Sequence, residues 1–560
     1  MTGETILDYL KGALSRAIDL KFPSGEASGV DVVIERPKQK SFCDLSTPVA
    51  MSLGKLLHAN PAAIAKDIMS VFRWDERFVE PDSQLTGSIV GGFINFRLSR
   101  AYLFSTLTAA VRSPEMFGRR QADRSRKMLF EFVSANPTGP MVVVNGRAAA
   151  IGDVMARVNE WMGNSVEREF YVNDFGNQVE LLGKSIACRY FQEKGIGSFE
   201  IPEGGYEGDY IKDFAVRIAS LHPEIETMET LPIEQLFKNE AVAMIIEEQR
   251  AILETYGVHY DRWFRESELH KSNAPAKALA LLREQKLTYC QDGAEWFMSS
   301  KFGDEKDRVL VRTDGSPTYF LSDLSYHVHK ASRGYVESFT FWGPDHHGYI
   351  PRLESAVKAL SLEKTLFRNF IIQQVNLIRD GKPFRMSKRK GDFITISELL
   401  DIVGVDAARY FFLMRRLSTH FDFDLSLAMK QTDENPVFYV QYAHARTCSL
   451  LKHALERGFT LEEIVDAPAQ PLVEPEELEV LKEIAEFPFV VENTAKFVEP
   501  HRITTYLEEL AAVFHHSYQK HRIVTDDRQL SLSRLLLTMG VRNTIKLGLD
   551  LLGVSAPERM

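Results

Sequence analysis

The stretch EFVSANPTGPMVVVNGRAAAIGD, residues 131–153, passes from an apolar strand through a turn of proline and glycine into a helix. The strand pattern covers residues 127–134, and a second strand, SVEREFYV, is predicted at 165–172 after the helix. Strand, crossover helix and strand make a βαβ unit, which predicts a parallel sheet with right-handed connections. Ligands bind beyond the carboxyl ends of such strands, where a helix N-terminus favours phosphate groups. These residues alone allow either a nucleotide site or an ordinary strand-to-helix loop.

The sequence on both sides of this unit predicts three parts, so the expected fold class is multidomain α/β. A small α+β module is predicted over residues 1–115, from an amphipathic helix near its start and a strand at 91–99. A parallel-sheet α/β centre is predicted over 116–430, with a helical insertion at about 178–300. Helical patterns run throughout 431–560, which predicts an all-helical bundle.

Alternating strand and helix patterns resume after the predicted insertion. They are the strands RVLVRTDG (308–315), SFTFWG (338–343) and FRNFIIQQVNLI (367–378), with a helix over 349–360. We expect these elements to extend the parallel sheet begun by residues 127–172.

The composition is that of an ordinary globular enzyme. The chain has 560 residues, 44% of them hydrophobic and 26% charged, with a formal net charge of -10. This balance argues only weakly against a nucleic-acid partner, because a local basic surface can still bind phosphates. No apolar run reaches the ~18 residues that would span a membrane, and no signal pattern precedes the first helix. We therefore expect a cytoplasmic protein with no membrane association and no structural metal; its four widely spaced cysteines are expected to be reduced thiols. They are Cys43, Cys188, Cys290 and Cys448.

A basic segment, FRMSKRKGDF at 384–393, contains Arg385, Lys388, Arg389 and Lys390. Such a loop could fold over a triphosphate and offset the charge of departing pyrophosphate. From charge alone, a solvated basic turn remains the alternative. The chain has no G-x-x-x-x-G-K-[ST] motif, so it is not a P-loop NTPase.

Two further segments carry polar groups in patterns typical of binding sites. FWGPDHHGYIPR (341–352) places an acid and two histidines at the carboxyl end of a predicted strand, where they could contact a ribose or a carboxylate. A buried structural histidine pair is the alternative. In SPTYFLSDLSYH (316–327), Tyr319 and Asp323 are four residues apart and share one helical face. In a pocket, Asp323 could accept two hydrogen bonds from a guanidinium; on the surface, the pair would have no ligand.

In their order along the chain, these segments resemble class I aminoacyl-tRNA synthetases, and most of all the bacterial-type arginyl-tRNA synthetase family. The resemblance covers essentially the whole sequence. It is carried by SANPTGP, YVNDFGNQ (171–178), YEGDYI (206–211), DRVLVRTDGSPTYF, WGPDHHGY, MSKR, GVDAARYFFLMR (404–415), NPVFYVQYAHAR (435–446) and the ending LLGVSAPERM.

The resemblance implies a role for each part. Residues 1–115 correspond to a tRNA-binding module that contacts the tRNA elbow, 116–430 to a Rossmann-type catalytic domain, and 431–560 to an anticodon-binding domain. It also implies the partners: arginine, ATP with Mg²⁺, and arginine-accepting tRNA. We expect a monomer.

Site residues are carried over from the family one by one. Arginine binding is expected at Ser134, Asn136, Tyr319 and Asp323, and also at Glu131 and His347. ATP binding is expected at Gly139, Gly146, Gly343, Asp345, His346 and Met386. The catalytic groups are expected to be Arg385, Ser387 and Lys388 in the position of the mobile KMSKS loop, together with Asn145.

The chain departs from the family at its HIGH signature, which aligns with Val142, Val143, Val144 and Asn145. The two histidines normally donate to phosphate oxygens. Val142 can donate nothing, Asn145 keeps one uncharged amide donor, and Val144 replaces a glycine on which adenine stacks. Losing one well-aimed donor to a transition state typically costs ~10²–10³ in rate. We expect the main-chain amides of the helix N-terminus and the basic loop to compensate.

The sequence therefore predicts an arginine–tRNA ligase that forms arginyl-adenylate and then transfers arginine to the tRNA 3′ end. The alternative is a catalytically inactive paralogue that binds tRNA or arginine as a regulator.

Overall fold

A parallel five-stranded sheet forms the centre of the computed structural model, which describes residues 5–23, 25, 27, 29–37, 43–82, 88–120, 125–196, 199–362, 364–384 and 394–560. Its strand order is β11-β10-β4-β5-β6, and every neighbouring pair is parallel. The chain runs from β4 to one edge and returns on the other side of β4, so the order reverses between β4 and β10. Such a reversal opens a crevice at the carboxyl ends of the strands. The strands are β4 (Lys127–Phe132), β5 (Ser165–Val172), β6 (Arg262–Arg265), β10 (Glu337–Trp342) and β11 (Leu366–Ile371).

Helix α5 (Val143–Trp161) connects β4 to β5 and confirms the predicted βαβ unit. Its apolar stripe, including Ile151 and Val154, is buried against the sheet. The contact is closest at Gly152, where an added Cβ would lie 2.1 Å from Cγ of Phe132. Glycine at this position therefore lets the helix lie directly on the strand that precedes it, which positions the turn between them.

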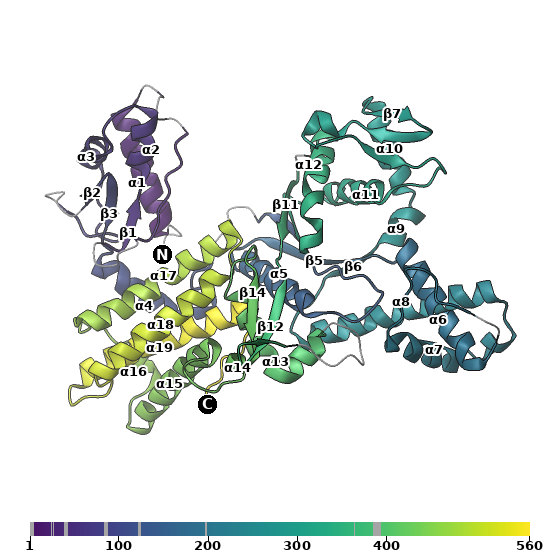
Figure 1. Ribbon diagram of the computed structural model, residues 1–560. Helices are drawn as coiled ribbons and strands as arrows, with labels where there is room; N and C mark the ends of the chain where they lie inside the picture. The colour runs from purple at the N-terminus through teal and green to yellow at the C-terminus, as the bar shows by residue number, and fades with distance from the viewer. Residues whose placement is uncertain are drawn as a thin grey trace.

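The helical insertion leaves the sheet after β5 and forms a separate lobe (Figure 1). The prediction of helix over about 178–300 is wrong in its C-terminal part, because β6 lies inside that range and pairs with β5. Its residue Phe264 is buried in the core. A four-residue strand is too short to show an alternating pattern, and its conformation comes from pairing with β5. The insertion helices are α6 (Asn177–Lys194), α7 (Asp209–Leu221), η2 (Pro223–Thr227) and α8 (Thr230–Thr255).

A second, antiparallel sheet lies in the lobe that follows β6. Its order is β7-β8-β9. The segment RVLVRTDG contains a strand as predicted, but this strand, β9, pairs with a local hairpin and does not extend the parallel sheet. The elements of this lobe are α9 (Glu266–Lys271), α10 (Ala274–Glu284), β7 (Thr288–Gln291), β8 (Ala294–Phe297), η3 (Ser299–Phe302) and β9 (Arg308–Val311).

The chain then completes the central sheet and adds a small third sheet beside it. The predicted strand at 367–378 is two strands, because β11 ends in the central sheet and β12 pairs with β13 and β14. The elements are α11 (Tyr319–Ser332), η4 (Pro344–Tyr349), α12 (Ile350–Ala359), β12 (Val375–Arg379), β13 (Lys382–Pro383), α13 (Ile396–Leu413), β14 (Phe421–Asp424) and α14 (Leu425–Ala428).

The C-terminal residues form the all-helical bundle that the sequence predicts. The apolar face of α18 is buried at Ile503, Leu507 and Leu510. No helix among the described residues is both long enough and apolar enough to cross a membrane. The bundle consists of α15 (Pro436–Glu456), α16 (Leu461–Val465), α17 (Pro475–Phe497), α18 (His501–Lys520) and α19 (Arg528–Leu552).

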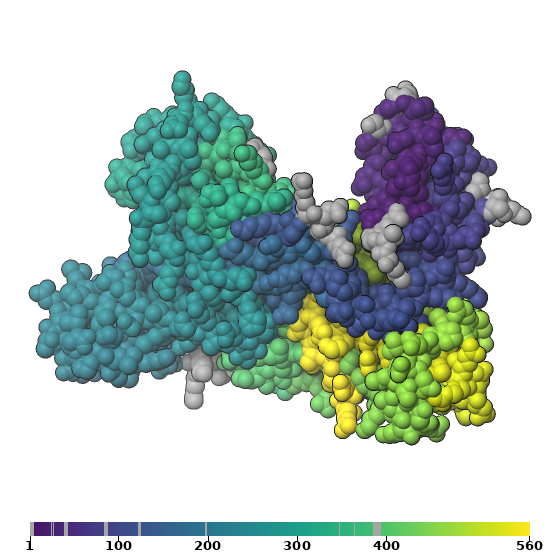
Figure 2. Space-filling view, turned by 180° about the vertical axis from the view of Figure 1, so that it is seen from behind, coloured from purple at the N-terminus to yellow at the C-terminus, as the bar shows by residue number. Residues whose placement is uncertain are grey.

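The N-terminal module stands on this bundle. Figure 2 shows it in purple above the yellow-green helices, apart from the teal lobe. Its last helix, α4, packs against the bundle: a Cβ on Gly540 would lie 2.4 Å from Leu107, and Asn543 donates to the carbonyl of Ala110 at 3.0 Å. Arg36 forms a further link through a 2.6 Å contact with Glu483. The module comprises α1 (Ile6–Lys21), β1 (Leu45–Thr47), α2 (Val49–Leu56), α3 (Pro61–Val71), β2 (Ile89–Val90), β3 (Phe93–Phe96), α4 (Arg100–Arg112) and η1 (Pro114–Met116).

Candidate active site

A cavity of about 2020 Å³ lies at the carboxyl ends of β4, β5 and β10, where the strand order reverses. Pockets for one small ligand typically measure ~300–1,000 Å³, so this cavity has room for more than one substrate. Its walls come from the β4–α5 turn, the starts of α9, α11 and α13, the η4 segment and the insertion.

The β4–α5 turn begins with two residues in a backbone conformation that side-chain-bearing residues rarely adopt. Val133 has φ 68° and Ser134 has φ 42°. Each such residue costs on the order of 1–3 kcal/mol, and such residues cluster at functional sites. The Ser134 hydroxyl accepts from the Tyr171 N–H at 3.1 Å and donates to Oε1 of Glu131 at 3.3 Å. The turn therefore holds Ser134 at the cavity wall in one orientation.

The main-chain amides at the start of α5 are largely committed to protein acceptors. The Val142 N–H donates to Oδ1 of Asn145 at 2.9 Å, and the Val143 N–H donates to the carbonyl of Ile394 at 3.2 Å. The Asn145 N–H donates to the Val142 carbonyl at 2.9 Å. The expectation that these amides replace the missing imidazoles is therefore wrong for three of them. The bridge between Val142 and Thr395 uses the Val143 N–H, and the other two amides donate within the turn itself.

Among Val142, Val143, Val144 and Asn145, Asn145 alone has a side chain that can donate to a ligand. It lines the cavity with Val142 and Val144, and all three are half-buried. Because its Oδ1 accepts from the Val142 N–H, the orientation of the amide is set and its Nδ2 is the donor left over.

The two glycines of the turn have different surroundings. Gly139 lines the cavity beside Tyr210, whose hydroxyl donates to the Thr138 carbonyl at 2.9 Å. Gly146, which we expected at the ATP site, is buried against α13, where an added Cβ would lie 2.8 Å from Cδ1 of Ile396. Its small size allows α5 to pack on α13. The expected contact between Gly146 and ATP is therefore wrong, because this glycine does not line the cavity.

Tyr319 and Asp323 lie one helical turn apart at the start of α11, and both line the cavity, as their spacing predicts. Tyr319 is 48% exposed, whereas Asp323 is buried. Burial raises the pKa of Asp323 to about 8. The hydrogen bond from Tyr349 opposes this rise in pKa, the neighbouring carboxylates Glu266 and Glu131 add to it, and the Lys330 ammonium opposes it. A guanidinium placed here would restore the ionised form of Asp323.

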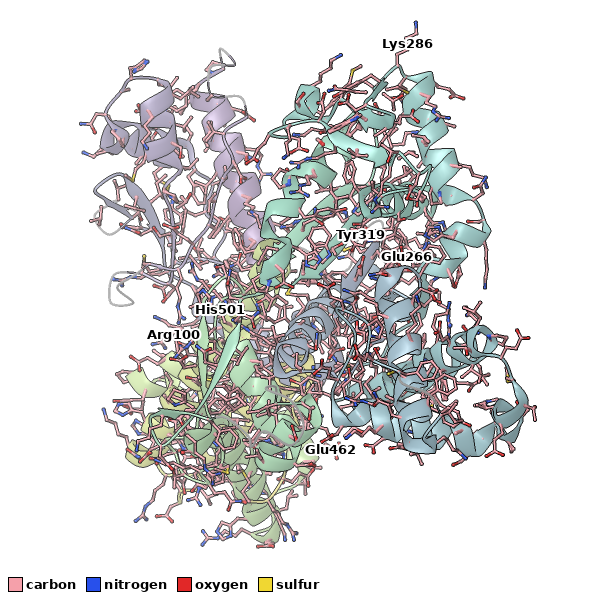
Figure 3. The ribbon with its side chains drawn as sticks, turned by 45° about the vertical axis from the view of Figure 1, so that its right-hand side comes forward. Arg100, Glu266, Lys286, Tyr319, Glu462 and His501 are labelled. Atoms are coloured by element: carbon pink, nitrogen blue, oxygen red, sulfur yellow. The ribbon has the colours of Figure 1, made fainter. Side chains whose placement is uncertain are left out.

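Glu266 is a second cavity carboxylate, and the sequence analysis missed it. It is the first residue of α9, immediately after β6, and is 4% exposed. Figure 3 shows it close to Tyr319. Burial raises its pKa to about 7, and the Asn173 amide donates to it at 2.6 Å once the amide oxygen and nitrogen of Asn173 are exchanged. The signal was its place at the carboxyl end of a strand, but that strand was not recognised.

Glu131, expected to contact arginine, has a different main partner. It is buried near the end of β4, and its carboxylate forms an ion pair with the fully buried ammonium of Lys330. Asn136 lines the cavity wall near it, and its carbonyl accepts from Gln249 at 3.3 Å. Glu131 also lines the cavity, and there it accepts from the Ser134 hydroxyl.

The η4 segment brings Gly343, Asp345 and His346 to the cavity, as predicted for the nucleotide end. The His346 ring stacks on Trp342 with centroids 5.6 Å apart. His347 lies in the same segment. Among the described residues, no group of three or more His, Cys, Asp or Glu side chains is arranged to hold a metal ion.

The predicted loop residues Arg385, Met386, Ser387 and Lys388 lie outside the described residues. The flanks of this segment are described. Ile394 pairs with the β4–α5 turn, and the Ile396 N–H donates to the Met141 carbonyl at 2.9 Å. Residues 394–396, which follow the basic segment, therefore lie at the edge of the cavity.

Comparisons with known proteins find related sequences along the whole chain. The family model "Arginyl tRNA synthetase N terminal domain" matches residues 4–98, "tRNA synthetases class I (R), catalytic domain" matches 106–411, and "DALR anticodon binding domain" matches 440–560. The arginine–tRNA ligase of Symbiobacterium thermophilum is 40% identical over 561 residues, covering 100% of this chain and 99% of the relative.

A second relative and a solved structure extend the comparison. The arginine–tRNA ligase of Caldanaerobacter subterraneus subsp. tengcongensis is 42% identical over 538 residues, which cover 95% of this chain and 94% of that protein. The structure of Thermus thermophilus arginyl-tRNA synthetase aligns with a TM-score of 0.78 at 23% identity over 99% of each chain, a likeness of fold.

Proposed function

The chain belongs to the class I arginyl-tRNA synthetase family, and we propose that the cavity at the carboxyl ends of β4, β5 and β10 is its arginine-activating site. The enzyme is an arginine–tRNA ligase. The observation that carries the proposal is the pair of buried carboxylates, Asp323 and Glu266, that face this cavity beside the half-exposed Tyr319. The comparisons give no support to the inactive alternative.

Arginine selection follows from the need of these carboxylates for a cation. Among the described residues, neither Asp323 nor Glu266 forms an ion pair with a lysine or arginine side chain. Glu266 accepts from Asn173 and lies 3.6 Å from His270, but neither contact supplies a permanent positive charge. A buried carboxylate without a cationic partner is costly. The planar guanidinium of arginine can donate to both carboxylates and to the Tyr319 hydroxyl at once. Lysine lacks that planar fork and would leave acceptors unsatisfied.

The first chemical step joins arginine to the nucleotide. The arginine carboxylate attacks the α-phosphate of ATP, which enters as its Mg²⁺ complex, and pyrophosphate leaves. Asn145 donates to a phosphate oxygen, while Arg385 and Lys388 offset the charge of the leaving group. Ser387 and Met386 belong to the same loop, and Asp345 and His346 face the adenosine. The protein mainly positions reactants and stabilises charge.

The second step transfers arginine to tRNA. The 2′-hydroxyl of the terminal adenosine attacks the mixed anhydride, an ester forms and AMP leaves. The C-terminal bundle reads the anticodon and the N-terminal module contacts the tRNA elbow. A monomeric state is also proposed. A cytoplasmic location is proposed because ribosomes use charged tRNA there.

Arginine-dependent exchange of pyrophosphate into ATP tests the function directly. With tRNA present, the purified chain should catalyse exchange with arginine but not with lysine. Binding of arginine and tRNA without exchange would contradict the assignment as an enzyme. Asp323→Asn should abolish exchange, whereas Asp292→Asn, at the exposed tip of the β7–β8 hairpin, should leave it unchanged. Equal activity of the two variants would move the arginine site away from Asp323.

A further inference from the structure

Lys330 is a fully buried lysine in the last turn of α11. Its ammonium forms an ion pair with Glu131, lies 3.4 Å from Oγ1 of Thr340, and lies 4.3 Å from the centre of the Tyr326 ring. Lysine is almost never fully buried unless it is paired. The reaction steps described so far do not use this residue, although it lies directly behind the cavity wall.

The neighbouring carboxylates are divided between protein partners and the cavity. Glu169 accepts from Tyr326 at 2.6 Å and from Arg333 at 2.5 Å. Glu131 is taken by Lys330. Asp323 and Glu266 have no lysine or arginine partner among the described residues, although Asn173 and His270 contact Glu266.

Lys330 also determines the direction of a hydrogen-bond chain that ends at the cavity. A lysine ammonium can only donate, so Glu131 must accept from it. The same carboxylate accepts at its other oxygen from the Ser134 hydroxyl, 3.3 Å away. The Ser134 proton therefore points to Glu131. One lone pair of the Ser134 oxygen accepts from the Tyr171 N–H, and the other is left to accept from a ligand.

The place of Ser134 tells which group of arginine would use this acceptor. Asp323 and Glu266, on α11 and α9, take the guanidinium. Ser134 lies instead in the β4–α5 turn, whose far end carries Asn145, where the arginine carboxylate meets the phosphate. The α-ammonium is attached to the same carbon as that carboxylate. It is therefore the donor that Ser134 meets.

We propose that Lys330 is a positioning residue: through Glu131 it orients the Ser134 hydroxyl as an acceptor for the α-ammonium group of arginine. This inference rests on the proposed function of the cavity. It assigns Glu131 an indirect part in arginine binding, with Ser134 as the contact.

Two substitutions break the chain in different ways. Lys330→Met leaves Glu131 as an unpaired buried carboxylate, which takes up a proton and becomes able to donate to Ser134. Glu131→Gln keeps the shape, but the amide carbonyl must face the Lys330 ammonium, so its NH₂ group faces Ser134. In both variants the Ser134 proton turns toward the cavity and opposes the α-ammonium.

The test compares arginine with 5-guanidinopentanoic acid, which has the guanidinium and carboxylate but no α-amino group. Binding to the full chain is measured by calorimetry. Each variant should lower the affinity for arginine about tenfold or more, which is the range for one hydrogen bond to a charged group. The affinity for the analogue should not change. Lys286→Met, an exposed lysine at the far end of the upper lobe (Figure 3), is the matched control and should change neither affinity.

The outcomes separate this inference from the proposed function. Equal weakening of both ligands would mean that Lys330 merely supports the fold, and unchanged binding of both would mean that it has no part; either result overturns the inference. If Lys330→Met does not fold, the affinities of Glu131→Gln for the two ligands test the inference instead. Failure of the unaltered chain to bind arginine would instead contradict the proposed function.

Discussion

Replacing Asn145 with aspartate separates its two roles at the start of α5. The Oδ1 of Asn145 accepts from the Val142 N–H at 2.9 Å, and its Nδ2 is left to face the cavity. Aspartate keeps an oxygen for the Val142 N–H but turns the donor into a charged acceptor. The variant therefore removes the phosphate contact and keeps the cap.

The magnitude follows from the loss of one donor. Removing a single well-aimed donor to a transition state typically costs ~10²–10³ in rate, or about 2.7–4 kcal/mol. The new negative charge also repels the phosphates, so the loss for Asn145→Asp is expected at the upper end of that range. The folded state should be no less stable, because an acidic side chain in the first turn of a helix contributes ~0.3–1 kcal/mol.

The assay is kcat for arginine-dependent ATP–pyrophosphate exchange, measured with thermal unfolding of the same samples. Asn145→Ala is the companion variant: it loses both roles, so it should lose rate and also about 0.5–2 kcal/mol of stability. If Asn145→Asp keeps its rate within a few-fold of the parent, Asn145 is not the phosphate donor. The compensation for the absent histidines would then have to come from elsewhere in the cavity.

Three further expectations follow from the cavity and its packing. Asp323→Ala should abolish arginine binding by calorimetry and spare tRNA affinity, because it removes the main acceptor for the guanidinium; unchanged arginine affinity would remove the pocket assignment. In the parent enzyme, arginine affinity should rise between pH 6 and 9. Burial raises the pKa of Asp323 to about 8 and of Glu266 to about 7, and only their ionised forms attract a guanidinium; a flat profile would contradict this. Gly146→Ala should cost ~1–3 kcal/mol of stability with an unchanged KM for ATP, since the new methyl group would meet Ile396; a raised KM at unchanged stability would return this glycine to the ATP site.

The central fold was predictable because its signals are local. The strand at 127–134, the following helix and the strand at 165–172 each show their own pattern, and the connection rules then leave one arrangement. β6 was not predictable in the same way. Its four residues become a strand by pairing with β5, which is a contact made only in the folded chain.

The residues of the candidate site differ in the same way, because some are predictable from the local sequence and others are not. Tyr319 and Asp323 could be predicted as a pair because residues four positions apart on a helix lie on the same face. Lys330 and Glu131 are 199 residues apart, and nothing near either residue indicates the other. Glu131 was therefore assigned to the ligand, although a buried lysine is its main partner. Glu266 was missed because the strand that positions it was missed.

The turn at 142–145 shows why main-chain amides cannot simply replace side-chain donors at a phosphate site. Helix N-terminal amides bind anions only while they have no protein acceptor. Here Val143 donates to Ile394, and Val142 donates to Asn145. These bonds remove donors from the phosphate, yet one of them joins the turn to the flank of the basic segment. The pairing that withdraws the Val143 amide therefore holds residues 394–396, which follow the basic segment, against the turn. Under the proposed function, catalysis without imidazoles draws on the side-chain amide of Asn145, whose orientation is set at the start of α5.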